Sequence, residues 1–214
     1  MIERPIETEW LIQYDKPLIV TIPDINSITG EKLTAFAPNT TGVPYGAEKE
    51  KEIIKHLFDI GCLFELITDI EILKLSFQRY AKQESEYRPE RKISSIKHVL
   101  KDTIDTSILI ANKDLLKNDV DKARFKEINT GINQFGHYVF AEKFGILEAQ
   151  VASSKAAYLA AIILTDYKGE LKRFSSRVPL TEYMITNPDY NFLNKRLKFV
   201  AQGEALFYWH QTIK

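Results

Sequence analysis

Cysteine is almost absent from this sequence: Cys62 is the only one in 214 residues. One thiol cannot close an internal disulfide, and it cannot supply the set of thiolates that a cysteine-based zinc site requires. Chains without disulfides are typical of reducing compartments. We therefore expect an intracellular protein and predict that it is cytoplasmic.

Net charge is absent as well, because 29 basic residues balance 29 acidic ones. The molecule as a whole therefore lacks the field that draws proteins to nucleic acids or anionic membranes, and such a partner would have to meet a local patch. Apolar residues make up 44% and charged residues 27% of the chain. That balance is typical of an ordinary soluble globular protein.

Long apolar runs are also missing. The longest weakly polar run, residues 156–164, is far shorter than the roughly 18 residues that cross a bilayer. The start of the chain includes Glu3, Glu7 and Glu9 and lacks the apolar core of a secretory signal. We therefore expect a soluble protein with no membrane partner.

Four common enzyme signatures do not occur in the sequence: G-x-x-x-x-G-K-[ST], G-x-G-x-x-G, G-x-S-x-G and H-E-x-x-H. Their absence argues against P-loop NTPases, Rossmann-type enzymes, α/β-hydrolases and zincin proteases, because each of these classes depends on its motif for binding or catalysis. We expect no cofactor.

Apolar residues recur at helical spacing through the centre of the chain, from Val120 to Tyr167. Steps of three and four residues place such a set on one side of a helix. The first half carries Phe125, Ile128, Ile132, Phe135 and Val139, and the second carries Leu147, Val151, Ser154, Tyr158 and Ile162 among many alanines. Alanine favours helix and lets a neighbouring helix approach closely. Gly145 lies between the halves and predicts the end of the first helix, followed by a helical hairpin or a kink.

Shorter patterns flank this centre. Residues 17–22 and 33–37 are predicted strands of a β-hairpin, and residues 171–174 a short strand. Helical patterns cover residues 47–60, 63–80, 93–111 and 192–200, although the second also fits a strand. Residues 82–91 should be an exposed connection, and residues 205–213 a docked strand or extended tail.

These patterns predict an α+β fold that is predominantly a helical bundle of about five helices with an N-terminal β-hairpin. We expect a single domain over residues 1–214. Within it, residues 1–46 would form the hairpin and a linker, and residues 47–214 the mainly helical body.

Arg91 and His98 form the first candidate catalytic pair. Six residues separate them, and seven positions make nearly two turns of helix, so both side chains would emerge on one side, which also carries Asp102. The spacing resembles the R-x4-6-H motif of HEPN ribonucleases. That resemblance implies that the histidine and the arginine act on the scissile phosphate at a dimer interface. Lys92 follows the arginine, where those families usually have a polar residue. A solvated helix face is the alternative interpretation.

Asp166 and the sequence Glu170-Leu171-Lys172 form a second candidate site. Glu-x-Lys on a strand resembles the end of a PD-(D/E)xK nuclease site, and the resemblance implies carboxylates that hold Mg²⁺ and a lysine that assists the attacking water. Asp166 and Glu170 flank a tight turn, whereas that site takes its carboxylates from neighbouring strands. A charged turn is therefore the alternative.

Basic residues gather between Arg79 and Lys101, where seven lysines and arginines stand against three glutamates. Lys168 to Phe199 repeats this excess. Lysine and arginine contact phosphates, and tyrosine stacks on unpaired bases. The candidate nucleic-acid-binding residues are Arg79, Tyr80, Arg88, Lys92 and Lys97.

No metal site is predicted, because the pairs Glu52/His56 and His98/Asp102 each offer only two ligands. We expect a non-enzymatic interaction or adaptor subunit in a nucleic-acid-handling assembly, with another protein or a second copy of the chain as partner. A HEPN-like or metal-dependent nuclease is the alternative. A small-molecule binder with a cavity between helices stays open as a third class.

Overall fold

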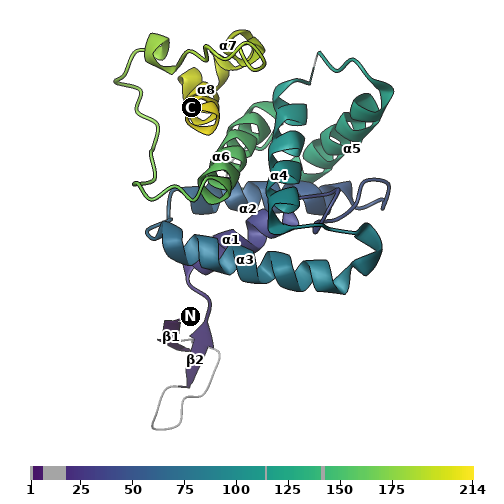
Figure 1. The fold of residues 1–214 in the computed structure, drawn as a ribbon, viewed down its shortest axis with the longest axis vertical. Helices are drawn as coiled ribbons and strands as arrows, with labels where there is room; N and C mark the ends of the chain where they lie inside the picture. Colours follow the sequence, from purple (N-terminus) through teal and green to yellow (C-terminus); the bar gives the residue numbers. More distant parts are fainter. Residues whose placement is uncertain (1, 7–17, 114, 141–142) are drawn as a thin grey trace.

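The computed structural model describes residues 2–6, 18–113, 115–140 and 143–214, and most of them are helical (Figure 1). The α-helices are α1 (Ile25–Ala35), α2 (Glu50–Phe64), α3 (Ile70–Tyr87), α4 (Ile96–Ala111), α5 (Asp119–Gly136), α6 (Ile146–Leu164), α7 (Phe192–Leu197) and α8 (Glu204–Ile213). Short 3-10 helices are η1 (Pro89–Arg91), η2 (Leu180–Tyr183) and η3 (Val200–Gly203). Strands β1 (Ile2–Pro5) and β2 (Ile19–Ile22) pair antiparallel. The predicted mainly helical fold with an N-terminal hairpin is confirmed. The predicted number of about five helices is too low, because the described residues form eight α-helices.

Helix α6 lies at the centre of the helical body and packs against α2, α4 and α8 (Figure 1). Its residues from Ala149 to Ala160 are buried almost without interruption, so no face of this part of the helix is fully exposed to solvent. Alanine and serine on α6 allow close approach: a Cβ added to Gly61 of α2 would lie 3.0 Å from the Cβ of Ala152. The alanine-rich second half of the predicted central stretch therefore forms a helix at the centre of the body.

Among the described residues, α6 is also the one helix long and apolar enough to cross a membrane by length and composition. Its 19 residues include a stretch with a mean hydropathy of 1.2, of which 78% is buried inside the protein. Core helices of soluble proteins have the same composition, and this degree of burial agrees with that role.

The central pair of helices is not the predicted hairpin. Gly145 precedes α6 as its N-cap and does not end α5, and its backbone N–H donates to Glu148 Oε2 at 2.8 Å. Helix α5 ends at Gly136 and packs mainly on α2 instead of on α6. The prediction failed because glycine is common at both ends of helices, and the first stripe of apolar residues does not show which helix it faces.

The hairpin uses a different partner strand from the one predicted. Strand β2 falls within the predicted residues 17–22, but residues 33–37 end α1 instead of forming a strand. Leu33, Phe36 and Ala37 are spaced three and four residues apart, so they share one face of a helical turn, and all three are buried. Asp24 begins α1, because its carboxylate accepts the N–H of Ser27 at 3.0 Å.

The structure confirms or corrects the predicted secondary structure of three further segments. Helix α3 confirms a helix within residues 63–80 and continues to Tyr87, so residues 82–91 are mostly its last turns and η1. Residues 171–174 are not a strand, since the N–H groups of Lys172 and Phe174 donate to the hydroxyls of Tyr158 and Tyr208. Residues 205–213 form α8 and not a strand or tail.

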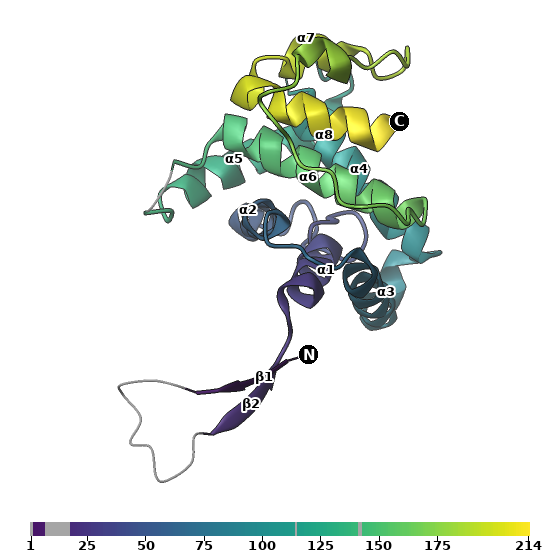
Figure 2. The same cartoon turned by 90° about the vertical axis from the view of Figure 1, so that its left-hand side faces the viewer.

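Helix α8 is aromatic because it fills the space beside α2 and α6. Tyr208 lies 4.9 Å from Phe64 and 6.0 Å from Tyr158 between ring centroids. Trp209 is fully buried as well. Aromatic residues favour strands in isolation, but tertiary packing overrides that preference here. At the other end of the molecule, Figure 2 shows β1 and β2 extending from the start of α1, away from the helices.

Candidate functional site

Arg91 and His98 do not lie on one helix. Arg91 ends η1, Lys92 follows with a left-handed backbone (φ 48°), and α4 begins only at Ile96. The Arg91 guanidinium donates to the carbonyl oxygens of Thr40 and Gly42, so it fastens η1 to the loop after α1. His98 is exposed in the first turn of α4. Helical spacing therefore does not relate the two side chains, and their catalytic role stays a prediction.

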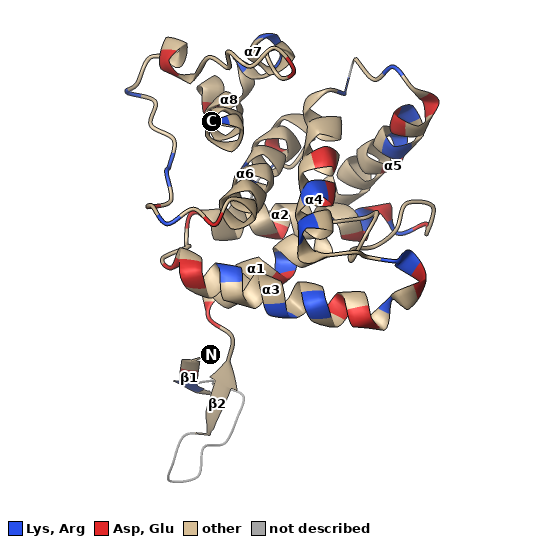
Figure 3. Cartoon of the chain, viewed as in Figure 1, with Lys and Arg blue, Asp and Glu red and all other residues tan. Residues whose placement is uncertain are grey.

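The candidate nucleic-acid-binding residues are spread over α3, η1 and α4. Arg79 is exposed and Tyr80 half-buried on α3, while Arg88 forms an ion pair with Glu84 one turn before it. Lys92 and Lys97 are exposed. Figure 3 shows acidic and basic segments mixed along α3. A contact between phosphates and the exposed Lys92 and Lys97 therefore stays a prediction.

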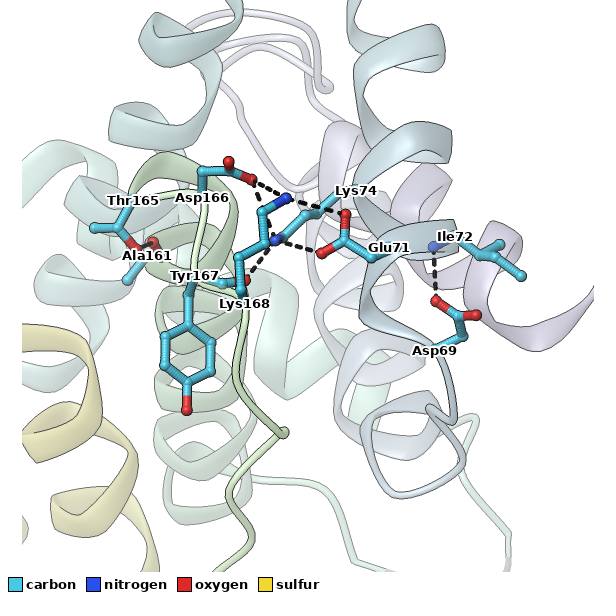
Figure 4. A network of polar contacts seen from close by, with 9 residues as sticks. All are labelled: Asp69, Glu71, Ile72, Lys74, Ala161, Thr165, Asp166, Tyr167 and Lys168. Atoms are coloured by element: carbon cyan, nitrogen blue, oxygen red, sulfur yellow. Dashed lines mark hydrogen bonds and ion pairs between the residues drawn. The ribbon is translucent and has the colours of Figure 1, made fainter.

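Asp166 belongs to a network of charged groups around Lys74 (Figure 4). The buried Lys74 ammonium lies 2.8 Å from Glu71 Oε1 and 3.3 Å from Asp166 Oδ1, and it donates to the carbonyl of Tyr167. Lys168 Nζ lies 2.9 Å from Asp166 and 3.4 Å from Glu71. Hydrogen bonds from Lys168 and then Lys74 hold the pKa of Asp166 below its usual range. The network joins α3 to the end of α6.

The remaining residues of this second candidate site lie on a loop. Asp166 follows the end of α6, and Glu170 and Lys172 are both exposed. The described residues from Asp166 to Lys172 contain no strand, so the strand geometry of a PD-(D/E)xK site is not reproduced. Across the parts of the chain that the structure describes, no group of three or more histidine, cysteine, aspartate or glutamate residues could hold a metal ion.

Asp102 is buried, so the alternative interpretation of a solvated helix face does not hold at this residue. Its carboxylate accepts the N–H of Asn39 at 2.8 Å, the Asn39 side-chain amide at 2.6 Å and the Thr40 hydroxyl at 2.8 Å. Burial raises the pKa of Asp102, and these hydrogen bonds oppose the shift. Asp102 therefore holds the loop after α1 on α4. Together with Arg91, it gives this loop two attachments.

A hollow with a mainly apolar lining runs between α2 and α6, and we name it the α2–α6 groove. Its volume is about 670 Å³. It is lined by Phe58, Gly61, Cys62, Glu65, Lys143, Phe144, Leu147, Glu148, Val151, Ala152, Lys155, Ala201 and Glu204. Phe58 and Phe144 meet edge to face with their ring centroids 5.3 Å apart, an arrangement that aromatic pairs favour. Leu147 remains 53% exposed.

Lys155 supplies the one buried charge of the α2–α6 groove. Its ammonium lies 2.9 Å from both Glu65 and Glu204 and above the rings of Phe64 and Tyr208, at 5.5 and 5.6 Å from their centroids. These contacts connect α6 to α2 and to α8. The lining as a whole holds three glutamates and two lysines, so its formal charge is negative.

The α2–α6 groove was not predicted from the sequence, because residues from three separate stretches of the chain form it: 58–65, 143–155 and 201–204. None of them belongs to a motif. The one local signal is the small residue pair Gly61 and Ala152, which brings the two helices together, but small residues are also common in helix contacts without a groove.

Comparisons with protein-family models, with curated proteins and with solved structures find no match for this chain.

Proposed function

We propose that this protein is a non-enzymatic interaction subunit that binds another polypeptide in the α2–α6 groove. The observation that carries the proposal is the apolar lining of this groove, which leaves Leu147 more than half exposed beside Phe144 and Val151. An apolar hollow with a charged rim is the arrangement that protein interfaces use, since the apolar part supplies affinity and the rim supplies specificity.

The charged groups that drew attention in the sequence support a non-catalytic role. The Arg91 guanidinium is bonded to backbone carbonyls, and the Asp166 carboxylate is paired with two lysines. Groups occupied in this way stabilise the fold and are less available to a substrate. The exposed Lys92 and Lys97 support the further proposal that the subunit acts in a nucleic-acid-handling assembly.

The proposal is tested by the substitution Leu147→Glu in the full chain. Leu75 of α3 is 55% exposed and does not line the groove, so Leu75→Glu is a matched control. We expect Leu147→Glu to abolish recovery of the groove's partner from the native cells, whereas Leu75→Glu retains it. Circular dichroism would establish that both variants fold. Equal recovery by both variants would contradict a role of the groove.

A further inference from the structure

The N-terminal hairpin has one aliphatic face. Ile2 pairs with Ile22 and Arg4 with Val20, and the N–H of Ile6 donates to the carbonyl of Leu18 at 2.8 Å. Directly opposed residues of an antiparallel pair share a face, and alternate residues along a strand do too. The face therefore consists of Ile2, Arg4, Ile6, Leu18, Val20 and Ile22.

This face is not covered by the helices. Leu18 is 63% exposed, and Ile2 and Ile22 are more than one third exposed. In the part of the chain that the structure describes, each strand packs extensively only on the other, and both views show the hairpin extending away from the helical body (Figures 1 and 2). An isolated two-stranded hairpin is marginally stable in water, and it gains stability when a further surface covers its apolar face.

The same chain offers a surface of matching chemistry. The lining of the α2–α6 groove is mainly apolar and includes three glutamates and two lysines. The hairpin face is aliphatic with Arg4 at its middle position. An arginine on an apolar face is best accommodated where a carboxylate stands beside an apolar surface. Glu65 lines the groove and is about half exposed, and it already pairs with Lys155 at 2.9 Å and lies 3.6 Å from Arg173. A carboxylate has four lone pairs, so Arg4 would be a further donor to Glu65.

The hairpin of one copy is held away from its own helices by a short connection. Only Pro23 and Asp24 lie between β2 and α1. The proline ring restricts the backbone, and Asp24 caps α1 through the N–H and the hydroxyl of Ser27. This short, capped connection limits how far the hairpin can turn toward its own helices. The groove of a second molecule does not require such a turn.

From these observations we infer that the hairpin face of one copy docks in the α2–α6 groove of a second copy, with Arg4 against the acidic rim. The inference rests on the proposed function and names the partner as a second copy of this chain. Each copy would give one hairpin and receive one, so the exchange closes as a two-fold dimer and leaves no groove or hairpin face uncovered.

The mass of the full chain in solution tests this assignment first. Sedimentation over a range of concentrations should show a monomer–dimer equilibrium for the natural sequence. Leu18→Glu and Leu147→Glu should each weaken dimerisation at least about tenfold, since each introduces a charge into an apolar contact. Leu75→Glu should leave it unchanged.

A disulfide between copies tests the geometry. Cys62 lines the α2–α6 groove and is the only natural cysteine, so Leu18→Cys adds one thiol to the hairpin face. Mild oxidation should give a dimer linked through Cys62 of one copy and the introduced thiol of the other, identified by peptide mass. Leu75→Cys is the control and should give no such linkage.

The possible results separate this inference from the proposed function. A chain that stays monomeric at every concentration, while Leu147→Glu still abolishes binding of a different protein, overturns the inference and leaves the function standing. A dimer that survives Leu18→Glu, or one broken by Leu18→Glu but not by Leu147→Glu, also overturns it. A disulfide formed within one copy would show that the hairpin docks on its own molecule, which contradicts the exchange.

Discussion

Helix α6 and the hairpin of β1 and β2 are both rich in apolar residues, yet they have opposite surroundings. Helix α6 is enclosed by α2, α4 and α8, whereas on the aliphatic face of the hairpin Ile2, Leu18 and Ile22 remain exposed. The difference teaches that an apolar pattern reveals a need for burial without revealing where the covering surface comes from. The surface that covers α6 comes from the same chain, and we propose that the surface that covers the hairpin face comes from a second copy.

The largest expected effect distinguishes these two regions by stability. Leu159 of α6 is fully buried, so Leu159→Ala should lower the free energy of unfolding by about 2–5 kcal/mol, because it removes buried methyl groups and leaves a cavity. Leu18→Ala on the hairpin should change it by less than about 0.5 kcal/mol in dilute, monomeric protein. Urea denaturation at low protein concentration measures both. Equal losses would mean that the hairpin is part of the monomer's core.

A smaller effect is expected where the core meets the α2–α6 groove. Lys155→Met keeps the length of the side chain but removes the ammonium between Glu65 and Glu204. Both glutamates are partly exposed, so we expect the free energy of unfolding to fall by about 1–2 kcal/mol. Breaking a fully buried ion pair would lower it by more. Urea denaturation again provides the measurement, and Lys55→Met on the exposed part of α2 is the control. A gain in stability would show that the ion pair costs more in desolvation than it returns.

The helical body should also lose stability in mild acid. Burial, and then the positive charge of Lys32, lower the pKa of His56, while Asp59 and Glu31 act in the opposite direction. The unfolded chain, with an ordinary histidine pKa of about 6.5, therefore binds more protons than the folded one at mildly acidic pH. The stability contributed by neutral His56 is present above that pKa and is lost as the pH falls below it.

His56→Gln should accordingly reduce the fall in stability between about pH 7 and pH 5. Denaturation midpoints measured across this range, for the natural sequence and the variant, provide the comparison. The exposed His98 supplies a control, because His98→Gln should leave the slope unchanged. Parallel pH profiles for all three proteins would contradict the assignment to His56.

The smallest effect on the fold is expected at the exposed lysines. Lys92→Glu and Lys97→Glu are combined in one variant, and each substitution should change the free energy of unfolding by less than about 0.5 kcal/mol. The double variant should bind single-stranded RNA more weakly than the natural sequence, in a salt-sensitive manner. Filter binding at two salt concentrations measures this, with Lys117→Glu combined with Lys126→Glu as a control pair on another exposed surface. RNA cleavage that is lost in His98→Ala would favour the nuclease alternative instead.

Local periodicity predicted α4, α6 and much of α5, because regular steps of three and four residues need no knowledge of distant contacts. It failed at residues 33–37 and 205–213, where β-favouring aromatic or branched residues lie in helices that fill gaps beside α2, α3 and α6. The partner of β2 was missed because residues 2–5 form a segment of only four residues, of which two are charged.

The surroundings of the candidate site residues could not be predicted from local periodicity, because they depend on contacts between distant segments. Whether the Arg91 side chain is available depends on the carbonyls of Thr40 and Gly42, about 50 positions away along the chain. Asp102 was expected on a solvated face but is enclosed by the loop at Asn39. The α2–α6 groove exists only once α2, α6 and α8 are assembled. Contacts between distant segments therefore determine where these side chains lie and whether the groove forms.

The reactivity of Cys62 gives the most direct test of the claim that the α2–α6 groove binds the hairpin of a second copy. The thiol is exposed in a monomer and lies in the groove that the hairpin would fill. Its alkylation should slow as the concentration of the natural protein rises, whereas in Leu18→Glu it should proceed at one rate throughout. Alkylation of the natural protein at the same rate across all concentrations would contradict the account.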